Sequence, residues 1–467
     1  MGAKPTKKRI ERIALVQMCR ENINWSDLGL GTGALKAYLQ KQRPDGYDIH
    51  IFRSTDFIQR ASNAVYDLVG ISTVSHYYDA AKSLAQWVRQ NAIAPLVIIG
   101  GPHITCAPES MTECFDFGVA GEGEQTLLEF LEAWNTGRAD AEIAAIPGII
   151  AWQGGAPRLS AQRSLLADLD ALPLPDLEVF KENQAIPSII LSRGCPFQCN
   201  FCISHAMWHR KVRNMSPEGV VRCLKEMNEA LGNLKVNVIK DDIAFINAAY
   251  LWKVIRAAEK IYPRLLEIPK VGYARADIFT REFAQALVQF GFYKVVFGLE
   301  SGSDRILSEL KGSRATVQKN QAALDIAQEA GLVSAGHFIV GVPTETPLDL
   351  RQTYQFILRN LGEGKLPSPT TTVLTPFPGT KYWQTLLHIE PGVTLQNFRW
   401  ERLEENGYAS YYSETKCSID EWWNYRQSNQ KIYLGSMPRG QFLDILREYE
   451  PAMIHQLEAF LAQDIRY

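Results

Sequence analysis

The stretch that decides the fold is Ser188-Ile-Ile-Leu-Ser-Arg-Gly-Cys195-Pro-Phe-Gln-Cys199-Asn-Phe-Cys202, in which a short apolar run precedes three closely spaced cysteines. Three thiolates at C-x3-C-x2-C spacing can bind three irons of a [4Fe-4S] cluster and leave the fourth iron open to a small molecule. Zinc is the alternative, because His205 and His209 follow closely. Structural zinc sites, however, use a second ligand pair at a different spacing. We therefore predict an iron–sulfur cluster on this loop.

Bulk composition sets limits on the partners of the chain. The 467 residues are 46% hydrophobic and carry a formal net charge of −2, so several ordinary cores fit and no basic excess points to nucleic acid. No run approaches the roughly 20 apolar residues of a membrane span. Apart from the loop, the cysteines are scattered without paired spacing. A reducing, cytoplasmic compartment is the expectation.

Residues 1–138 predict a doubly wound, Rossmann-like α/β domain. From residue 10 onward, short apolar segments alternate with amphipathic ones, which is typical of a parallel sheet covered by helices. The expected strands are 13–18, 47–52, 67–72 and 96–100. Ligands of such sheets lie beyond the carboxyl ends of the strands.

Two of these strand ends carry small residues where a large ligand can approach the backbone. They are Ser72-Thr73 and Gly100-Gly101, and His103 follows the second. Glycine allows a close approach and unusual φ values. The alternative is that the two glycines only make a turn.

Residues 184–385 contain six strand–helix units, which predict an open, partial (β/α)6 barrel. Polar residues follow several of the expected strands, and this edge of a barrel is where ligands bind. Arg275 suits a carboxylate ligand, although an ion pair with Asp277 or Asp242 is an equal alternative. The polar residues at this edge are Asp241, Asp242, Arg275, Glu300 and Ser301.

The remaining segments are a connector and a C-terminal cap. Residues 139–183 predict a linker with a small hairpin at 147–155 and a proline-stiffened stretch at 172–176. Residues 386–467 predict a small, mainly helical region rich in aromatic side chains. These side chains either pack a core or close the mouth of the barrel.

The cysteine spacing, with Phe201 before the last cysteine, resembles that of the radical S-adenosylmethionine (SAM) enzymes. Glu300-Ser301 and Thr375-Pro-Phe-Pro-Gly-Thr380 are similar to further motifs of that family. The resemblance implies that SAM binds the open iron and that an electron from the cluster cleaves it to a 5′-deoxyadenosyl radical. A flavodoxin- or ferredoxin-like donor is the implied source of the electron.

The resemblance also implies roles for individual residues. The aromatic ring of Phe201 packs on the adenine of SAM. The implied cluster ligands are Cys195, Cys199 and Cys202. The implied contacts of the SAM amino group, carboxylate, ribose and methionine portions are Asp242, Arg275, Glu300 and Ser301.

The N-terminal region is similar to the cobalamin-binding domain that one large group of radical SAM enzymes carries. The similarity rests on the two small-residue strand ends and on Gly118-Val-Ala-Gly121-Glu-Gly-Glu124. After the first strand the chain reads Cys19-Arg-Glu-Asn-Ile-Asn-Trp25, without Asp-x-His-x-x-Gly, so we expect no histidine beneath the cobalt. The implied cobalamin contacts are Ser72, Thr73, Gly100, Gly101 and His103. Three further side chains either line the cobalt face or pack a seam between domains: His76, Tyr77 and Tyr78.

These resemblances imply a C-methyltransferase acting on an unactivated carbon of a small molecule. Its cofactors are a [4Fe-4S] cluster, SAM and cobalamin, and the transfer runs through methylcobalamin and the 5′-deoxyadenosyl radical. One alternative is a cyclase, ring-rearranging or oxidising enzyme with the same cofactors. The other is a protein that senses cobalamin without catalysis. The identity of the substrate stays open.

Overall fold

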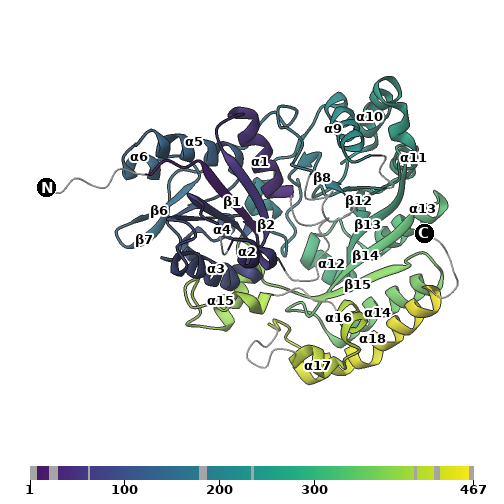
Figure 1. Ribbon diagram of the computed structural model, residues 1–467. Coiled ribbons are helices and arrows are strands. Elements are labelled where there is room, and N and C mark those ends of the chain that lie inside the picture. The colour runs from purple at the N-terminus through teal and green to yellow at the C-terminus, as the bar shows by residue number, and fades with distance from the viewer. Residues whose placement is uncertain are drawn as a thin grey trace. The chain divides into compact units, whose positions relative to one another are not determined.

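The computed structural model describes residues 8–19, 30–61, 64–177, 187–232, 236–403, 408–424 and 432–461. The chain folds into two compact units (Figure 1). We call them the sheet unit (residues 1–188, 226–232 and 391–401) and the barrel unit (residues 189–225, 233–390 and 402–467). These units do not follow the predicted segments one to one, because part of the C-terminal region belongs to the sheet unit.

The sheet unit is built on seven strands in the order β2-β1-β3-β4-β5-β6-β7, of which β1 to β5 are parallel. The central strands are nearly all apolar because helices cover both faces of such a sheet. The parallel strands are β1 Arg12–Gln17, β2 Asp48–Arg53, β3 Leu68–Ser72, β4 Leu96–Gly100 and β5 Phe117–Val119. Its helices are α1 Leu30–Gln42, α2 Ser54–Ala61, α3 Tyr78–Gln90, α4 Pro102–Cys106, α5 Gly123–Asn135 and α6 Asp140–Ala144.

The predicted hairpin is present and completes this sheet. Strands β6 Ile149–Gln153 and β7 Ala156–Leu159 pair antiparallel, and β6 pairs with β5. The two-residue turn consists of Gly154 and Gly155, which have φ values of 60° and 80°. Positive φ at both central residues is the geometry that matches the twist of a hairpin. The first half of the predicted linker is therefore part of the sheet, while residues 178–183 lie outside the described residues.

The barrel unit contains a six-stranded sheet in the order β15-β14-β13-β12-β11-β8, with β11 to β15 parallel. Because the order follows the sequence without closure, the prediction of an open six-stranded barrel is confirmed. The strands are β8 Ser188–Ile189, β11 Asn237–Ile239, β12 Lys270–Ala274, β13 Phe292–Glu300, β14 Val333–Val340 and β15 Ser368–Val373. Helices of the repeat are α9 Pro217–Ala230, α10 Ala248–Ile261, α11 Arg281–Gln289, α12 Asp304–Lys311, α13 Val317–Glu329 and α14 Pro347–Gly362.

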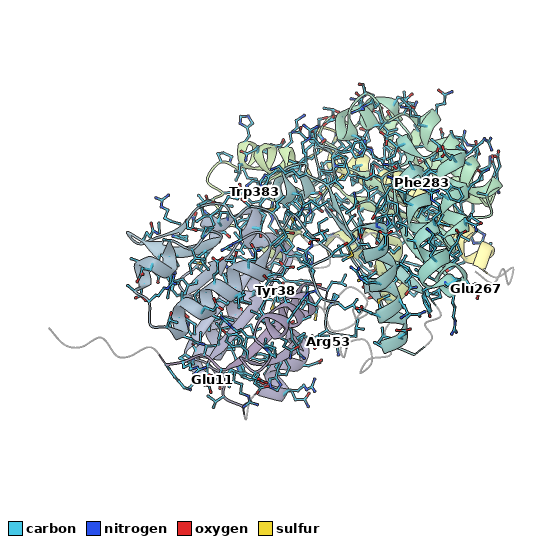
Figure 2. The ribbon with its side chains drawn as sticks, turned by 90° about the horizontal axis from the view of Figure 1, so that it is seen from above. Glu11, Tyr38, Arg53, Glu267, Phe283 and Trp383 are labelled. Atoms are coloured by element: carbon cyan, nitrogen blue, oxygen red, sulfur yellow. The ribbon has the colours of Figure 1, made fainter. Side chains whose placement is uncertain are left out.

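Side-chain packing fixes which face of this sheet the helices cover. Phe338 on β14 lies 6.2 Å from Phe356 on α14, between ring centroids. Phe283 on α11, labelled in Figure 2, is buried and its ring lies 5.7 Å from that of Phe279. Successive side chains of a strand point to opposite faces. His337, the neighbour of Phe338, therefore points to the inner face of the barrel.

The C-terminal region is helical, as predicted, and its aromatic side chains are mostly core. Trp422 and Trp423 are buried. Glu450 on the last helix accepts hydrogen bonds from the Tyr354 and Thr371 hydroxyls at 2.6 and 2.5 Å, which fasten that helix to the barrel. Among the helices that the structure describes, none combines the length and apolar content of a membrane crossing. The helices are α15 Lys381–Ile389, α16 Tyr408–Thr415, α17 Ile419–Asn424 and α18 Arg439–Leu461.

Candidate functional site

The cysteine loop begins where a small two-stranded ribbon ends, at a glycine that no other residue can replace. Strand β9 (Ser192–Arg193) pairs antiparallel with β10 (Arg213–Asn214). Gly194 follows with φ of 100°, and a Cβ there would lie 2.1 Å from the carbonyl oxygen of Lys211. Such a contact is impossible without moving the backbone, so glycine is required where the loop begins.

The three thiols lie on a loop anchored to the barrel. All three are free, and Cys199 is buried while Cys195 and Cys202 are half-buried. The backbone N–H of Asn200 donates to the carbonyl of Leu310 at 2.9 Å, at the end of α12. The Cys202 sulfur accepts a backbone N–H from Ser204 at 3.4 Å. Phe201 is half-buried beside them.

The chemistry of the donor set fits a cluster. Burial raises the pKa of the Cys202 thiol to about 12 and also raises the pKa of Cys195, so both are protonated at neutral pH. A bound metal such as iron supplies the positive charge that stabilises their thiolates. In a cubane cluster each thiolate binds a different iron, so the sulfurs need not converge on one point. Among the described residues, no three His, Cys, Asp or Glu side chains are grouped as the shell of a single ion.

Asp241 and Asp242 both hold the segment that carries the cysteines. Asp241 is buried and accepts from Leu191 N at 2.7 Å and from the Ser192 hydroxyl at 2.6 Å. Burial raises its pKa to about 7. Asp242 accepts the Gly194 N–H at 3.0 Å, one residue before the first cysteine. Its contact with the SAM amino group stays a prediction.

Arg275 joins the loop to the end of β12. Its Nε and Nη2 donate to the two carboxylate oxygens of Asp277 at 2.5 and 3.1 Å, which is the ion pair that the sequence offered as an alternative. Its Nη1 donates to the Cys199 sulfur at 3.1 Å. The guanidinium carbon lies 3.9 Å from the ring centroid of Phe197.

Glu300 stands at the end of β13 in a backbone conformation that is unusual for its type. Its φ is 61°, next to a register shift in the pairing with β14, and it is only 6% exposed. Strained backbone of this kind persists only where the surroundings hold it, and it gathers at functional sites. The ammonium of Lys311 lies 3.4 Å from the Glu300 carboxylate and donates to the Gly298 carbonyl at 2.6 Å. The Lys311 contact thus orients the carboxylate at the barrel edge.

Ser301 is fully buried in a hydroxyl network. Its Oγ lies 2.9 Å from the Thr353 hydroxyl and accepts the Ser303 N–H at 3.1 Å. These bonds fix the turn that follows Glu300. A direct contact of Ser301 with SAM stays a prediction.

The sequence analysis missed the polar side chains on the inner face of the barrel. His337 is exposed there, and Glu300 and Lys240 both act on its charge. The Lys240 ammonium lies 5.7 Å from the ring centroid of Tyr273. The sequence gives little signal for His337, because Ala335 and Ile339 on the same face of the strand are apolar and buried.

The sheet unit brings the predicted cobalamin contacts together at the carboxyl ends of β3 and β4. Thr73 N donates to Gly100 O at 3.1 Å, and His103 N donates to Thr73 O at 3.2 Å. Gly101 has φ of 96°, and a Cβ there would lie 2.7 Å from Thr73 O. At Gly121, by contrast, an added Cβ would meet nothing within 4 Å. An added Cβ at Gly101 would thus collide with the backbone of Thr73, which is fully buried, so glycine is required where these two strand ends meet. We call Ser72–Thr73 together with Gly100–Gly101 the backbone ledge.

His103 itself is a core residue in this structure. It is 1% exposed, and its Nδ1 and Nε2 lie 3.1 and 2.9 Å from the Ser75 and Ser110 hydroxyls. The rings of Tyr78 and Trp400 lie 4.1 and 4.4 Å from it, between centroids. With both nitrogens hydrogen-bonded, the ring would have to leave the core to bind a ligand.

Tyr78 packs in the core of the sheet unit. It is fully buried, and its hydroxyl donates to Ser110 O at 2.8 Å. His76 and Tyr77 are half-buried, with rings 4.0 Å apart. The sequence after the first strand, residues 20–25, lies outside the described residues.

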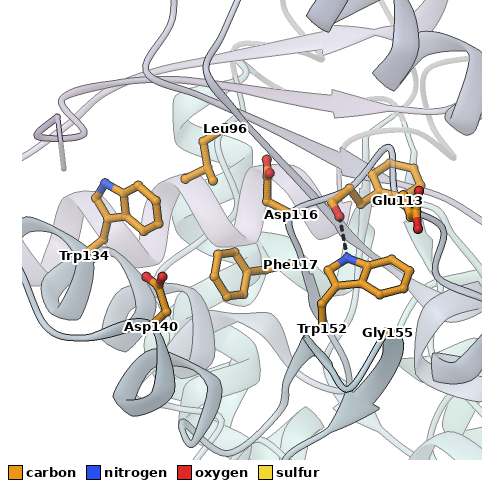
Figure 3. A pocket seen from close by; sticks show the side chains of 9 residues that line it. Leu96, Glu113, Asp116, Phe117, Trp134, Asp140, Trp152 and Gly155 are labelled. Carbon is orange, nitrogen blue, oxygen red and sulfur yellow. Dashed lines mark hydrogen bonds between the residues drawn. The ribbon is translucent and has the colours of Figure 1, made fainter. Parts of the chain in front are cut away.

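A groove of about 510 Å³ lies at the opposite edge of the same sheet. Figure 3 shows Phe117 between Trp134 and Trp152, whose indole N–H donates to Phe115 O at 3.0 Å. Leu96 and Phe117 begin β4 and β5, so the groove is at the amino ends of the strands. It is therefore separate from the backbone ledge.

A three-thiol loop at the start of an open six-stranded barrel defines the class of radical SAM enzymes, and the family comparisons agree. Residues 189–357 match the model of the radical SAM superfamily, and residues 24–131 match that of the B12-binding domain. The chain belongs to the cobalamin-dependent radical SAM enzymes, which use a [4Fe-4S] cluster, SAM and cobalamin. The predicted family, fold class and cofactors are confirmed.

Individual relatives point the same way. The chain is 30% identical to an uncharacterized methyltransferase of Pyrococcus horikoshii, over 76% of this chain and 80% of the relative. It is 23% identical to a cytidylyl-2-hydroxyethylphosphonate methyltransferase of Streptomyces wedmorensis, over 73% and 74% of the two chains. The radical SAM methyltransferase TsrM of Kitasatospora setae, solved with cobalamin and a [4Fe-4S] cluster, shares the fold, with a TM-score of 0.67, 16% identity and coverage of 97% and 89%.

Proposed function

We propose that this chain is a cobalamin-dependent radical SAM C-methyltransferase that methylates an unactivated carbon of a small molecule. The observation that carries the proposal is the loop of three free thiols at the barrel edge where Arg275 and Glu300 also end their strands. The carboxyl ends of parallel barrel strands meet at one edge, so these groups can serve one ligand. The names of the methyltransferase relatives support the reaction type.

The chain's residues bind and orient the cofactors, which supply the radical chemistry and the transferred methyl group when bound. In the proposal, Phe201 packs on adenine, Asp242 and Arg275 take the amino acid end of SAM, and Glu300 and Ser301 take the ribose and methionine portions. The cluster ligands are Cys195, Cys199 and Cys202. The proposed cobalamin contacts are Ser72, Thr73, Gly100 and Gly101. His103, predicted as a further contact, is a core residue and supports this turn through its backbone N–H to Thr73 O.

The proposal also covers organisation and partners. Residues 1–138 bind cobalamin, 184–385 form the radical SAM barrel, and 386–467 form a cap, with 139–183 between the first two. A flavodoxin- or ferredoxin-like protein supplies the electron, and the enzyme works in the reducing cytoplasm. Because the chain has a formal net charge of −2 and no basic excess, the proposal includes no nucleic acid partner.

The test uses the full chain, loaded with cobalamin and reconstituted anaerobically with iron and sulfide. SAM with a trideuterated methyl group is added with a reductant and a small-molecule extract of the host cells. The proposal expects 5′-deoxyadenosine and a deuterium-labelled product. A protein that forms no 5′-deoxyadenosine contradicts radical SAM chemistry. The Cys199→Ala variant is the control for formation by other routes.

A second candidate has support from other relatives. The chain is 26% identical to an anaerobic magnesium-protoporphyrin IX monomethyl ester cyclase of Rubrivivax gelatinosus, but spans only 53% of that protein. In the same assay, 5′-deoxyadenosine together with a changed but unlabelled product supports a cyclase or oxidising enzyme. Label in the product excludes it.

A further inference from the structure

One cysteine of the loop has a charged hydrogen-bond donor. The Arg275 Nη1 lies 3.1 Å from the sulfur of Cys199, whereas the Cys202 sulfur accepts a backbone N–H at 3.4 Å. The Arg275 and Asp277 side chains are 7% and 4% exposed. A charge-assisted hydrogen bond in such a buried setting is stronger than a neutral one in water.

We propose that Arg275, held in place by Asp277, is a positioning residue that donates an N–H···S bond to the cluster ligand Cys199 and raises the reduction potential of the cluster. The inference rests on the proposed function, because it assumes that Cys199 binds the cluster. Hydrogen bonds to cluster sulfurs and nearby positive charge stabilise the reduced, more negative state. The residue thereby sets how readily the cluster accepts the electron it later gives to SAM.

The guanidinium is aimed by three separate contacts. Asp277 engages Nε and Nη2, which leaves Nη1 directed at the sulfur. The ring of Phe197, two residues before Cys199, lies 3.9 Å below the guanidinium carbon. A planar fork can satisfy a carboxylate on one side and a sulfur on the other, which the single ammonium of lysine cannot do. The plane and direction of the donor are therefore fixed before any ligand arrives.

The proposed function gives Arg275 a further role, the direct binding of the SAM carboxylate. The two roles differ in a protein that holds the cluster but no SAM. Tuning of the cluster acts there already, whereas carboxylate binding acts only when SAM is added.

The test is a redox titration of the full-length, reconstituted protein without SAM, followed by electron paramagnetic resonance of the reduced cluster. The main variant is Arg275→Met with Asp277→Asn, since removing the arginine alone would leave a buried carboxylate without its partner. We expect a more negative potential, equivalent to at least a tenfold change in the ratio of reduced to oxidised cluster, or 59 mV for one electron. Arg275→Lys, which keeps the positive charge but not the planar fork, should give a smaller shift in the same direction.

The matched control is Arg281→Met, which removes an exposed arginine paired with Glu329 on the outside of the barrel. The reduction potential of the cluster in this variant should equal that in the unmodified protein. Iron and sulfide contents are measured in every variant, and Arg275→Lys decides the question if the double variant binds no cluster. Equal potentials in all variants overturn the inference, even if SAM affinity falls. An unmodified protein without an iron–sulfur cluster overturns the proposed function instead.

Discussion

The two edges that we propose as cofactor sites are built from different groups, side chains at one and backbone at the other. At the barrel edge, charged side chains are buried and paired, as in Asp277 with Arg275 and Lys311 with Glu300. At the carboxyl edge of the sheet unit, the strand ends are joined by backbone groups, because Thr73 N donates to Gly100 O. The first edge prepares an electrostatic environment for reactive groups. The second edge presents backbone rather than paired charges, and this suits a large ligand that is held by many contacts along its length.

The largest expected effect comes from removing a cluster ligand. Cys199→Ala should abolish cluster binding and 5′-deoxyadenosine formation, because an alanine supplies no ligand and leaves Arg275 without its sulfur. Cobalamin binding should persist, since the ledge lies in the other unit. Iron analysis and the absorption spectrum of bound cobalamin measure the two outcomes. Retained turnover would contradict the assignment of the loop.

The next effect tests the backbone ledge. Gly101→Ala should lower cobalamin affinity by at least about tenfold, because the new Cβ meets Thr73 O at 2.7 Å while φ is 96°. We expect a loss of about 2–4 kcal/mol in the stability of the sheet unit, from clash and strain together. Cluster content should not change.

A matched control separates strain from clash. Gly137 has φ of 73°, but an added Cβ there meets nothing within 4 Å. Gly137→Ala should therefore cost only about 1–2 kcal/mol of backbone strain and leave cobalamin affinity intact. If both variants bind cobalamin equally well, the ledge does not contact the cofactor.

Local sequence patterns were sufficient for the parts of each edge that depend on local chemistry. Glycines and cysteine spacing are local, so the loop and the strand ends were predicted. Contacts between segments that are distant in sequence were not predicted. Trp400 N donates to Asp79 at 2.7 Å across more than 300 positions of sequence, and no periodicity encodes that pairing. The same holds for Arg275 and Cys199, which lie 76 positions apart.

Burial gives two individual groups, Asp241 in the barrel unit and His103 in the sheet unit, opposite responses to pH. Asp241 has the larger effect. Its pKa is raised by burial to about 7, from 3.8 in an exposed chain. Between these values the folded state holds a proton that the unfolded state releases, so stability falls as pH rises. The contribution is about 2 kcal/mol between pH 5 and pH 7.

Asp241→Asn should remove this slope. The amide can still accept from Leu191 N and can donate to the Ser192 hydroxyl, so both bonds survive in a neutral form. Hydrogen exchange of the β8–β9 segment at several pH values measures the local opening free energy. Glu345, whose pKa burial raises to about 8, remains as a second contribution in the same unit. An unchanged slope near the cysteine loop would show that Asp241 is ionised in the folded protein.

The smallest expected effect is that of His103 in the sheet unit, and its sign is reversed. Burial lowers its pKa to about 3, with Lys82 adding to the effect, so below about pH 6.5 the unfolded chain binds a proton that the folded state refuses. Stability therefore falls as pH drops, by about 1.5 kcal/mol between pH 6.5 and pH 5. His103→Gln should reduce that slope in hydrogen exchange of β3 and β4, while the half-exposed His50 serves as the control position. If the slope persists in His103→Gln but disappears in His50→Gln, the acid sensitivity does not come from His103.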